Sequence, residues 1–382
     1  MNQKPQVLVI TNYRKDRQYS MQRFGRILLD DVNIFQDFDI KEIFPLQNFG
    51  SFFRTGEISK WFNYIDKYVI FPLRIKKILK KNSETIRIVH VIDQSNAPYI
   101  KTIKNISSAK CLVTCHDLIA VRTAQGEFPL APETSPSGKK LQSWIRNTLT
   151  SADYYACDSM ETKRDLNRIV PSSILTSTVI HLGTELNVSK RTKYNYTKHE
   201  ISYIPTKENF MLHVGSAAWY KNRKAVFESF LHTHEKTNLK ELKLILVGPP
   251  PQEHELSLKL KTFINLYPKS IITIENACEQ TLNQLYQNAE FLIFPSYIEG
   301  FGWPPLEAAS IGCPVITTKT GAIHDLLSDY PKYVDPNNQE SINFAVTQLL
   351  ESKENFKFEN SLPSNKDFKL NYYKLYQSLL KN

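Results

Sequence analysis

The stretch EFLIFPSYIEGFGWPPLEAASIGCPVITTK, residues 290–319, contains the elements of one folding unit in consecutive order. Its two ends, residues 290–296 and 314–319, are apolar almost without interruption, as buried parallel strands are. Pro304 and Pro305 suit the first turn of a helix between these strands, because the first turn leaves amide hydrogens without helical partners. The order strand, helix, strand predicts a parallel sheet covered by helices.

The same alternation of strand-like and helical segments runs through the whole chain. The other strand candidates are residues 6–12, 38–45, 86–93, 110–118, 153–159 and 177–183 in the first half, and 209–215, 242–248 and 270–276 in the second. A chain of 382 residues is also long for one hydrophobic core. We therefore predict an α/β protein with two Rossmann-like, doubly wound parallel-sheet domains that face a central cleft. Ligands are expected at the carboxyl ends of the strands.

The predicted domain boundaries follow changes in composition. Residues 186–207 are polar and charged and lack a sustained period, so we assign them to a linker. The first domain then covers residues 1–185 and the second covers residues 208–362. The last segment, residues 363–382, has apolar side chains at helical spacing and is predicted to be a helix.

The charge of the chain favours anionic partners. Lysine and arginine number 48 against 38 acidic residues, which gives a net charge of +10. The densest basic cluster, RIKKILKK at residues 74–81, follows a segment with apolar side chains at helical spacing, namely Ile58, Trp61, Ile65 and Val69. Pro72 is expected to interrupt that helix. Two interpretations remain open: an amphipathic helix packed on a sheet with a solvated basic end, or a basic aromatic surface that rests on anionic lipid.

Other features of the sequence argue against several classes of protein. The loop after the first strand lacks the G-x-G-x-x-G of dinucleotide enzymes, and no P-loop sequence occurs. The histidines and the five cysteines do not have metal-ligand spacing, so we expect no metal cofactor. Scattered cysteines fit a reducing cytoplasm, and we find neither a signal peptide nor a bilayer-spanning stretch. We expect a cytoplasmic protein, soluble or peripheral on the inner face of a membrane, with no nucleic acid partner.

The stretch quoted above also carries candidate functional residues. Glu299 falls in the loop after a strand, and Glu307 is expected in the first turn of the next helix. Gly300 and Gly302 on either side of Phe301 permit close backbone approach, and amide groups at a helix start suit a phosphorylated or hydroxylated ligand. Carboxylates beside such amides can bind a sugar through its hydroxyl groups. For Glu307 alone, the alternative is a side chain that only complements the helix dipole.

Several segments together resemble one enzyme family. Glu299 and Glu307, separated by seven residues within PSYIEGFGWPPLEAASIGCPVITTKTGAI, resemble the E-x7-E signature of the retaining nucleotide-sugar glycosyltransferases of the GT-B fold, family 4. The resemblance extends to TCHDLIA at 114–120, ADYYACDSMETKRDL at 152–166, VIHLGTE at 179–185 and MLHVGSAAWYKNRKAVFESF at 211–230. It covers nearly the full chain and is weakest over residues 13–80.

The resemblance implies a role for each matching residue. Glu307 would hold the ribose of the nucleotide, Glu299 would contact the donor sugar, and His116 would hydrogen-bond that sugar from the first domain. The loop around the helix start would touch sugar hydroxyls or phosphate through Gly300, Phe301, Gly302 and Trp303. The terminal helix at 363–382 would cross back to the first domain, which would bind the acceptor.

The phosphate site departs from the family pattern. Lys221 would lie against the diphosphate and stabilise the charge of the leaving group, which can replace a divalent metal. The family commonly has an arginine where this chain has Ser216, and a hydroxyl brings no charge. Arg223 is the candidate to compensate.

The implied activity is transfer of a sugar from a nucleotide-diphosphate sugar to a hydroxyl of a saccharide or lipid-linked acceptor. The transfer retains the anomeric configuration, in a hexosyl- or mannosyltransferase of cell-surface polysaccharide or lipopolysaccharide synthesis. It would proceed by a front-face reaction without a protein nucleophile. Alternatives on the same scaffold are a nucleotide-sugar epimerase, a phosphorylase or, because of Ser216, a sugar-nucleotide-binding protein without catalysis.

Overall fold

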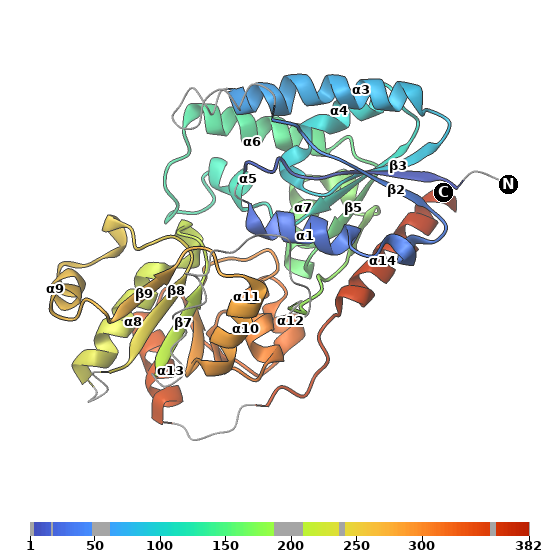
Figure 1. Ribbon diagram of the computed structural model, residues 1–382. Helices are drawn as coiled ribbons and strands as arrows, with labels where there is room; N and C mark the ends of the chain where they lie inside the picture. The colour runs from blue at the N-terminus through green and yellow to red at the C-terminus, as the bar shows by residue number, and fades with distance from the viewer. Residues whose placement is uncertain are drawn as a thin grey trace. The chain divides into compact units, whose positions relative to one another are not determined.

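The computed structural model describes residues 4–16, 18–47, 62–186, 209–236, 241–351 and 357–381. These residues form two compact units (Figure 1). The first unit comprises Met1–Pro129, Glu133–Gly183 and Pro363–Asn382, and the second comprises Leu130–Pro132 and Thr184–Leu362. Apart from Leu186, the linker predicted over residues 186–207 lies outside the described residues.

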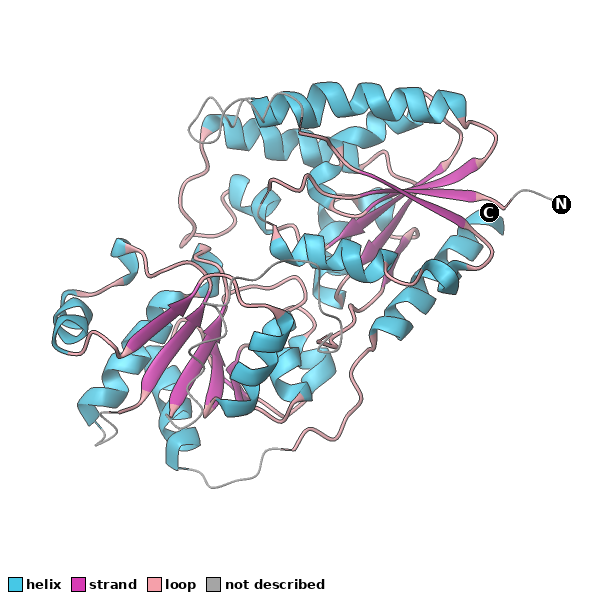
Figure 2. Cartoon of the chain, viewed as in Figure 1, coloured by secondary structure: helices cyan, strands magenta, loops and turns pink. Residues whose placement is uncertain are grey.

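The first unit is built on a parallel sheet with the strand order β2-β1-β3-β4-β5-β6. Its strands are β1 (Gln6–Ile10), β2 (Asp39–Ile43), β3 (Ile86–Val91), β4 (Lys110–Cys115), β5 (Tyr154–Cys157) and β6 (Ser177–Val179). β1, β3, β4 and β5 are almost wholly buried because helices pack against both faces of the sheet (Figure 2). The helices are α1 (Tyr19–Leu29), α3 (Phe71–Lys81), α4 (Pro98–Lys104), α5 (Ile119–Ala124), α6 (Pro136–Leu149), α7 (Met160–Ile169) and α14 (Asn365–Lys381), with short turns η1 (Val32–Phe35), η2 (Asp66–Ile70), η3 (Gln94–Asn96) and η4 (Pro171–Ser173).

The second unit repeats this plan with the strand order β12-β11-β10-β7-β8-β9, again all parallel. Its strands are β7 (Phe210–Val214), β8 (Lys243–Val247), β9 (Ile271–Ile274), β10 (Phe291–Phe294), β11 (Val315–Thr317) and β12 (Lys332–Tyr333). The helical elements are α8 (Arg223–Lys236), α9 (Leu258–Leu266), α10 (Glu279–Asn288), α11 (Trp303–Ser310), α12 (Ile323–Leu327) and α13 (Gln339–Glu351), with η5 (Trp219–Lys221) and η6 (Glu253–Glu255). Two parallel sheets with interspersed helices confirm the predicted fold class.

The C-terminal helix α14 packs in the first unit, although the chain reaches it from the second. Its buried face carries Phe368, Tyr372 and Tyr376. The Tyr376 hydroxyl is 2.7 Å from Nδ1 of His90 in β3, and the Tyr372 hydroxyl is 2.8 Å from Oγ1 of Thr114 in β4. α14 therefore covers the sheet of the first unit and supplies partners for its buried polar groups.

The expected interruption at Pro72 is wrong. Residues 62–81 are helical without a break, and Pro72 is the second residue of α3. The preceding turn η2 is a π-helix, in which the amide of Phe71 donates to the carbonyl oxygen of Asp66. A π turn widens the backbone at a proline that would otherwise clash with the preceding turn. Ile58 and Trp61 lie outside the described residues.

Candidate active site

Lys221 and Glu299 form an ion pair beyond the carboxyl ends of β7 and β10. Nζ of Lys221 donates to Oε1 of Glu299 at 2.7 Å and to Oε2 at 3.0 Å. The side chains are only 14% and 8% exposed, respectively. Nζ also lies 4.9 Å from the ring centroid of Phe294, at the end of β10. The fold thus joins two residues that are 78 positions apart in the sequence.

Backbone contacts hold the two loops of this pair together. Asn222, between η5 and α8, has a left-handed φ of 51°. Its side-chain amide donates to the carbonyl oxygens of Pro295 at 3.2 Å and Pro336 at 2.9 Å. The amide of Tyr297 donates to the carbonyl oxygen of Tyr220 at 2.8 Å. Lys221 is therefore fixed from both sides at the start of α8.

Two glycines let the loop that carries Glu299 pack closely against the loop after β11. Gly302 has a φ of 91°, and a Cβ atom there would lie 2.5 Å from the side chain of Ile323. Gly321 has a φ of 63°, and a Cβ atom there would lie 3.0 Å from the carbonyl oxygen of Phe301. The amide of Glu299 donates to Oγ1 of Thr320 at 3.0 Å. The tight approach of these loops leaves no room for larger residues.

Glu307 lies deeper than the sequence indicates. α11 begins at Trp303, so Glu307 is its fifth residue and not part of the first turn. The side chain is 2% exposed, and Oε2 accepts a hydrogen bond of 3.0 Å from the hydroxyl of Tyr286 in α10. A buried carboxylate beyond the first turn does not serve mainly to complement the helix dipole, so that alternative for Glu307 is wrong.

The other predicted donor residues lie around this pair. Gly300, Phe301 and Trp303 are buried in the loop and at the helix start, and the rings of Phe301 and Trp303 are 6.2 Å apart in an edge-to-face arrangement. Ser216 is exposed in the loop after β7, where its Oγ accepts a hydrogen bond of 3.4 Å from the amide of Ala218. Contacts of these groups with a ligand stay predictions.

Arg223 is engaged within the protein. The residue is 3% exposed, and Nη1 donates to the carbonyl oxygen of Pro249 at 3.0 Å. Nε lies 3.2 Å from Oε1 of Glu255, while Nη2 is buried without a hydrogen-bond partner. Burial lowers the pKa of Arg223, and Glu255 opposes that shift. In this structure the charged partner of the guanidinium is therefore Glu255.

His213 is a buried residue next to the site that the sequence indicates only as core. Nδ1 donates to the carbonyl oxygen of Ile293 at 2.9 Å, and Nε2 has no hydrogen-bond partner. Burial lowers its pKa to about 3, so the ring is neutral. A Cβ atom on Gly215 would lie 3.1 Å from Nε2, so glycine lets the loop after β7 pass over the ring. The apolar residues of β7 around His213 predict only that this residue is buried.

His116 belongs to the first unit and already has two partners there. Nδ1 is 2.6 Å from Oδ2 of Asp158, and Nε2 donates to the carbonyl oxygen of Ile92 at 2.7 Å. Burial by itself lowers the pKa of His116, but the carboxylate of Asp158 outweighs burial and raises it to about 9. Both ring nitrogens face acceptors, so the ring carries two protons. A hydrogen bond to a sugar would require one of these contacts to break, and that role stays a prediction.

Two further observations concern the described part of the chain. No group of three or more histidine, cysteine, aspartate or glutamate side chains is placed there to hold a metal ion. The helices in the same ranges are too short or too polar to span a bilayer.

Comparison with known proteins shows what the chain is similar to. Residues 196–366 match the family of group 1 glycosyl transferases. The O-antigen chain mannosyltransferase RfbU of Salmonella typhimurium is 29% identical over 144 residues, which cover 37% of this chain and only 39% of that protein. A sucrose-phosphate synthase from Thermosynechococcus elongatus has the same fold, with a TM-score of 0.69 at 15% identity over 99% of this chain and all of that one. An Anabaena protein crystallised with UDP and glucose has a TM-score of 0.63 at 12% identity over 97% of this chain and 94% of that one.

Residues 196–366, which match the group 1 glycosyl transferases, lie mainly in the second unit. The two units of the chain have the GT-B architecture. Lys221, Glu299 and Glu307 all fall within the family segment.

Proposed function

We propose that the chain is a retaining glycosyltransferase of polysaccharide or lipopolysaccharide synthesis. It transfers a hexose, with mannose as the first candidate, from a nucleotide-diphosphate sugar to a hydroxyl of a saccharide or lipid-linked saccharide. The observation that carries the proposal is the ion pair of Lys221 and Glu299, with the buried Glu307 in the same family segment. The similarity to an O-antigen chain mannosyltransferase supports mannose and a glycan acceptor. The fold shared with a protein crystallised with UDP and glucose supports a nucleotide-sugar donor.

In this proposal, Lys221 binds the diphosphate of the donor and Glu299 binds its sugar. Without donor, the charges of Lys221 and Glu299 offset each other in a largely buried position. When a diphosphate binds at the start of α8, the ammonium group can turn to phosphate oxygens, where the amides at the helix start add favourable charge. The carboxylate of Glu299 is then available to accept hydrogen bonds from sugar hydroxyls. Donor binding thus exchanges one ion pair for two sets of charge-assisted hydrogen bonds.

The rate enhancement in this proposal comes from positioning and charge. Lys221 stabilises the negative charge that develops on the departing diphosphate, so a bound metal ion is not needed. Glu307 fixes the nucleotide, and Glu299 fixes the sugar relative to the acceptor. Neither glutamate acts as a covalent nucleophile. The departing phosphate oxygen helps to take the proton of the acceptor hydroxyl on the same face of the sugar.

The direct test is an assay of sugar transfer in the presence of EDTA. GDP-mannose and UDP-glucose are incubated with the full chain and a panel of reducing-end-tagged oligosaccharides, and products are identified by mass and by the anomeric coupling in NMR. We expect acceptor-dependent release of nucleotide diphosphate and a product with the anomeric configuration of the donor. Inversion of configuration, or activity only with added divalent metal, would contradict the mechanism.

A second candidate, a sugar-nucleotide-binding protein without catalysis, is favoured by two observations. Ser216 offers no charge, and Arg223 is engaged with Glu255. In that case the chain binds donor without turnover on any acceptor. The third alternative, an epimerase, would convert the donor sugar in the absence of acceptor, which the same assay detects.

Cytoplasmic location with peripheral membrane contact is part of the proposal. The helical stretch over residues 62–81 leaves Tyr64, Val69 and Leu73 between 44% and 60% exposed. Lysines follow within α3, and its other face, with Phe71, is buried in the core. Sedimentation with vesicles of anionic lipid at low salt, and release at high salt, would support this contact. Equal binding to neutral vesicles would count against it.

A further inference from the structure

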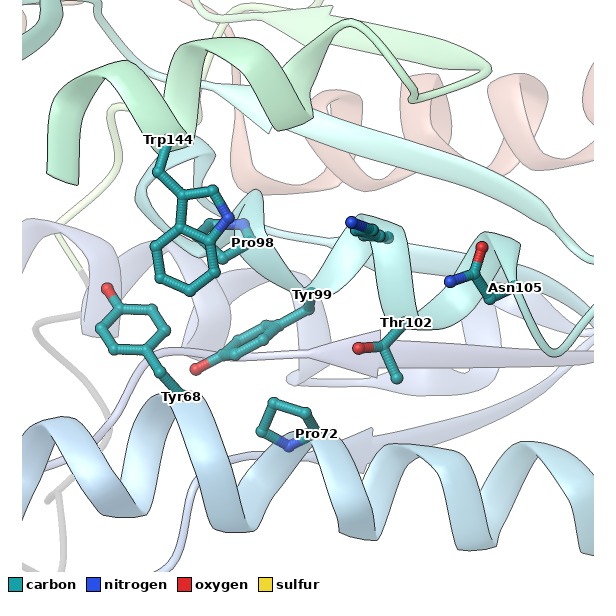
Figure 3. A pocket seen from close by; sticks show the side chains of 8 residues that line it. Tyr68, Pro72, Pro98, Tyr99, Thr102, Asn105 and Trp144 are labelled. Carbon is teal, nitrogen blue, oxygen red and sulfur yellow. The ribbon is translucent and has the colours of Figure 1, made fainter. Parts of the chain in front are cut away.

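A pocket in the first unit is formed by the helical elements η2, α3, α4 and α6 and contains none of the residues discussed as the candidate active site (Figure 3). Its volume is about 280 Å³. This volume is near the lower end for small-molecule sites, so it fits one small ring and not a long chain. Tyr68, Tyr99 and Trp144 gather around this space in Figure 3.

The aromatic rings of this pocket are inclined to one another, and the ring of Trp144 is partly open to water. The ring centroid of Tyr68 is 5.2 Å from that of Trp144, with the planes at 54°. It is 6.3 Å from that of Tyr99, with the planes at 42°. Trp144 is 42% exposed. An exposed tryptophan ring that lines a hollow can pack on a ligand with an apolar face.

The pocket also holds polar groups. The Tyr99 side chain is fully buried, and its hydroxyl has no hydrogen-bond partner. Burial raises the pKa of Tyr99 well above its usual value, so the hydroxyl stays neutral and can donate. Lys101, Thr102 and Asn105 line the same space from α4 and its C-terminal end. A buried hydroxyl without a partner is unfavourable, and a hydroxylated ligand would provide that partner.

The local backbone also supports a ligand site in this pocket. Tyr68 is presented by the π turn η2, and Pro72 after that turn is also part of the pocket wall. π turns are rare and frequently occur at functional sites. Tyr68 is thus placed by an irregular turn and not by a regular helix.

We propose that this pocket binds one pyranose unit of the glycan acceptor, at a site separate from Lys221 and Glu299. The inference rests on the proposed function for the identity of the glycan. A pyranose ring has a C–H face that packs on an aromatic ring, and its hydroxyl groups match the polar side chains of α4. The ligand would lie against Trp144 and Tyr68 and give Tyr99 a hydrogen-bond partner.

Two other ligand classes fit the pocket less well. An acyl or prenyl chain favours aliphatic surroundings, and the described residues that line the pocket include no leucine, isoleucine, valine or methionine. A nucleobase favours a slot with parallel walls, whereas the Tyr68 and Trp144 planes are inclined at 54°. A puckered sugar ring tolerates such an inclination.

The test is saturation-transfer NMR with the full chain and methyl α-D-mannopyranoside or methyl α-D-glucopyranoside as probes. We expect transfer to the ring protons of at least one probe, with a Kd on the order of 1–10 mM for so small a ligand. Trp144→Ala and Tyr99→Phe should each weaken this binding about fivefold or more, while Trp144→Phe keeps most of it. Phe344→Ala, which removes an aromatic ring that is 65% exposed in the second unit, is the matched control.

Unchanged binding in Trp144→Ala and Tyr99→Phe would overturn the proposal. Binding of uridine or guanosine that depends on the same two residues would also overturn it, in favour of a nucleoside site. The NMR readout needs no turnover, so absence of transferase activity leaves this test intact. Conversely, loss of the pocket should leave the stabilisation of the chain by nucleotide sugar unchanged.

Discussion

At single residues, the candidate site is defined by the charge pair of Lys221 and Glu299. We predict that Lys221→Ala lowers kcat by about 100-fold or more, because an electrostatic contact with the leaving group is lost. Lys224→Ala is the matched control, since Lys224 is an exposed lysine in the first turn of α8, which follows Lys221. Steady-state kinetics with the preferred donor measure both. Wild-type turnover in Lys221→Ala would remove the lysine from the proposed mechanism.

Replacement of Arg223 can distinguish a role in stability from a role in binding the donor phosphates. Arg223→Ala would leave Glu255, which is 6% exposed, without its ion-pair partner. We expect a loss of about 3 kcal/mol in the free energy of unfolding, measured by chemical denaturation. The double variant Arg223→Ala/Glu255→Ala should recover part of this loss. If Arg223→Ala instead keeps its stability and only weakens donor binding, the arginine replaces the charge missing at Ser216.

The pair of His116 and Asp158 predicts a dependence of stability on alkaline pH. The pKa of His116 is raised to about 9 in the folded chain, above the value near 6.5 expected when unfolded. The unfolded chain therefore releases this proton first, and the stabilisation is complete below pH 6.5 and is lost as pH rises through 9. We expect Tm to fall between pH 7 and 9.5 in the wild type. The fall should be smaller in Asp158→Asn; an identical fall would contradict the assignment.

Among the helices, α14 shows how a terminal segment completes a buried polar network. Burial lowers the pKa of His90 to about 3, so its neutral ring relies on the hydroxyls of Tyr376 and Thr114. Tyr376→Phe removes one partner, and we expect it to cost about 2 kcal/mol. In a unit of this size that is a decrease of roughly 4 to 8 °C in Tm. Leu380→Ala, at a 39% exposed position of the same helix, should change Tm little.

The sequence predicted the strands β1 to β11 because their apolar runs are clear. It missed the two-residue strand β12, which is too short to show a period. It also extended strands past their ends: residues 110–118 include His116, whereas β4 ends at Cys115. The π turn before Pro72 could not be predicted, because a wider turn and a broken helix are both compatible with proline, and packing decides between them.

For the whole molecule, the proposed function predicts stabilisation by donor without metal. A ligand that binds only the native state at 100 times its Kd adds about 2.7 kcal/mol to the free energy of unfolding. We expect GDP-mannose or UDP-glucose to raise Tm in the presence of EDTA. Glu307→Gln should reduce this shift, because its carboxylate is assigned to the ribose. A shift that appears only with added magnesium would contradict metal-independent binding.

The sequence by itself determined the class of the fold and singled out Glu299 and Glu307 as candidate site residues, because periodicity and residue spacing are local properties of the chain. Only the tertiary structure decided which groups meet. It joined Lys221 to Glu299 and paired Arg223 with Glu255 and His116 with Asp158. It also gathered Tyr68, Tyr99 and Trp144 around one pocket. Such pairings depend on strand order and loop packing across long separations, which no local pattern in the sequence records.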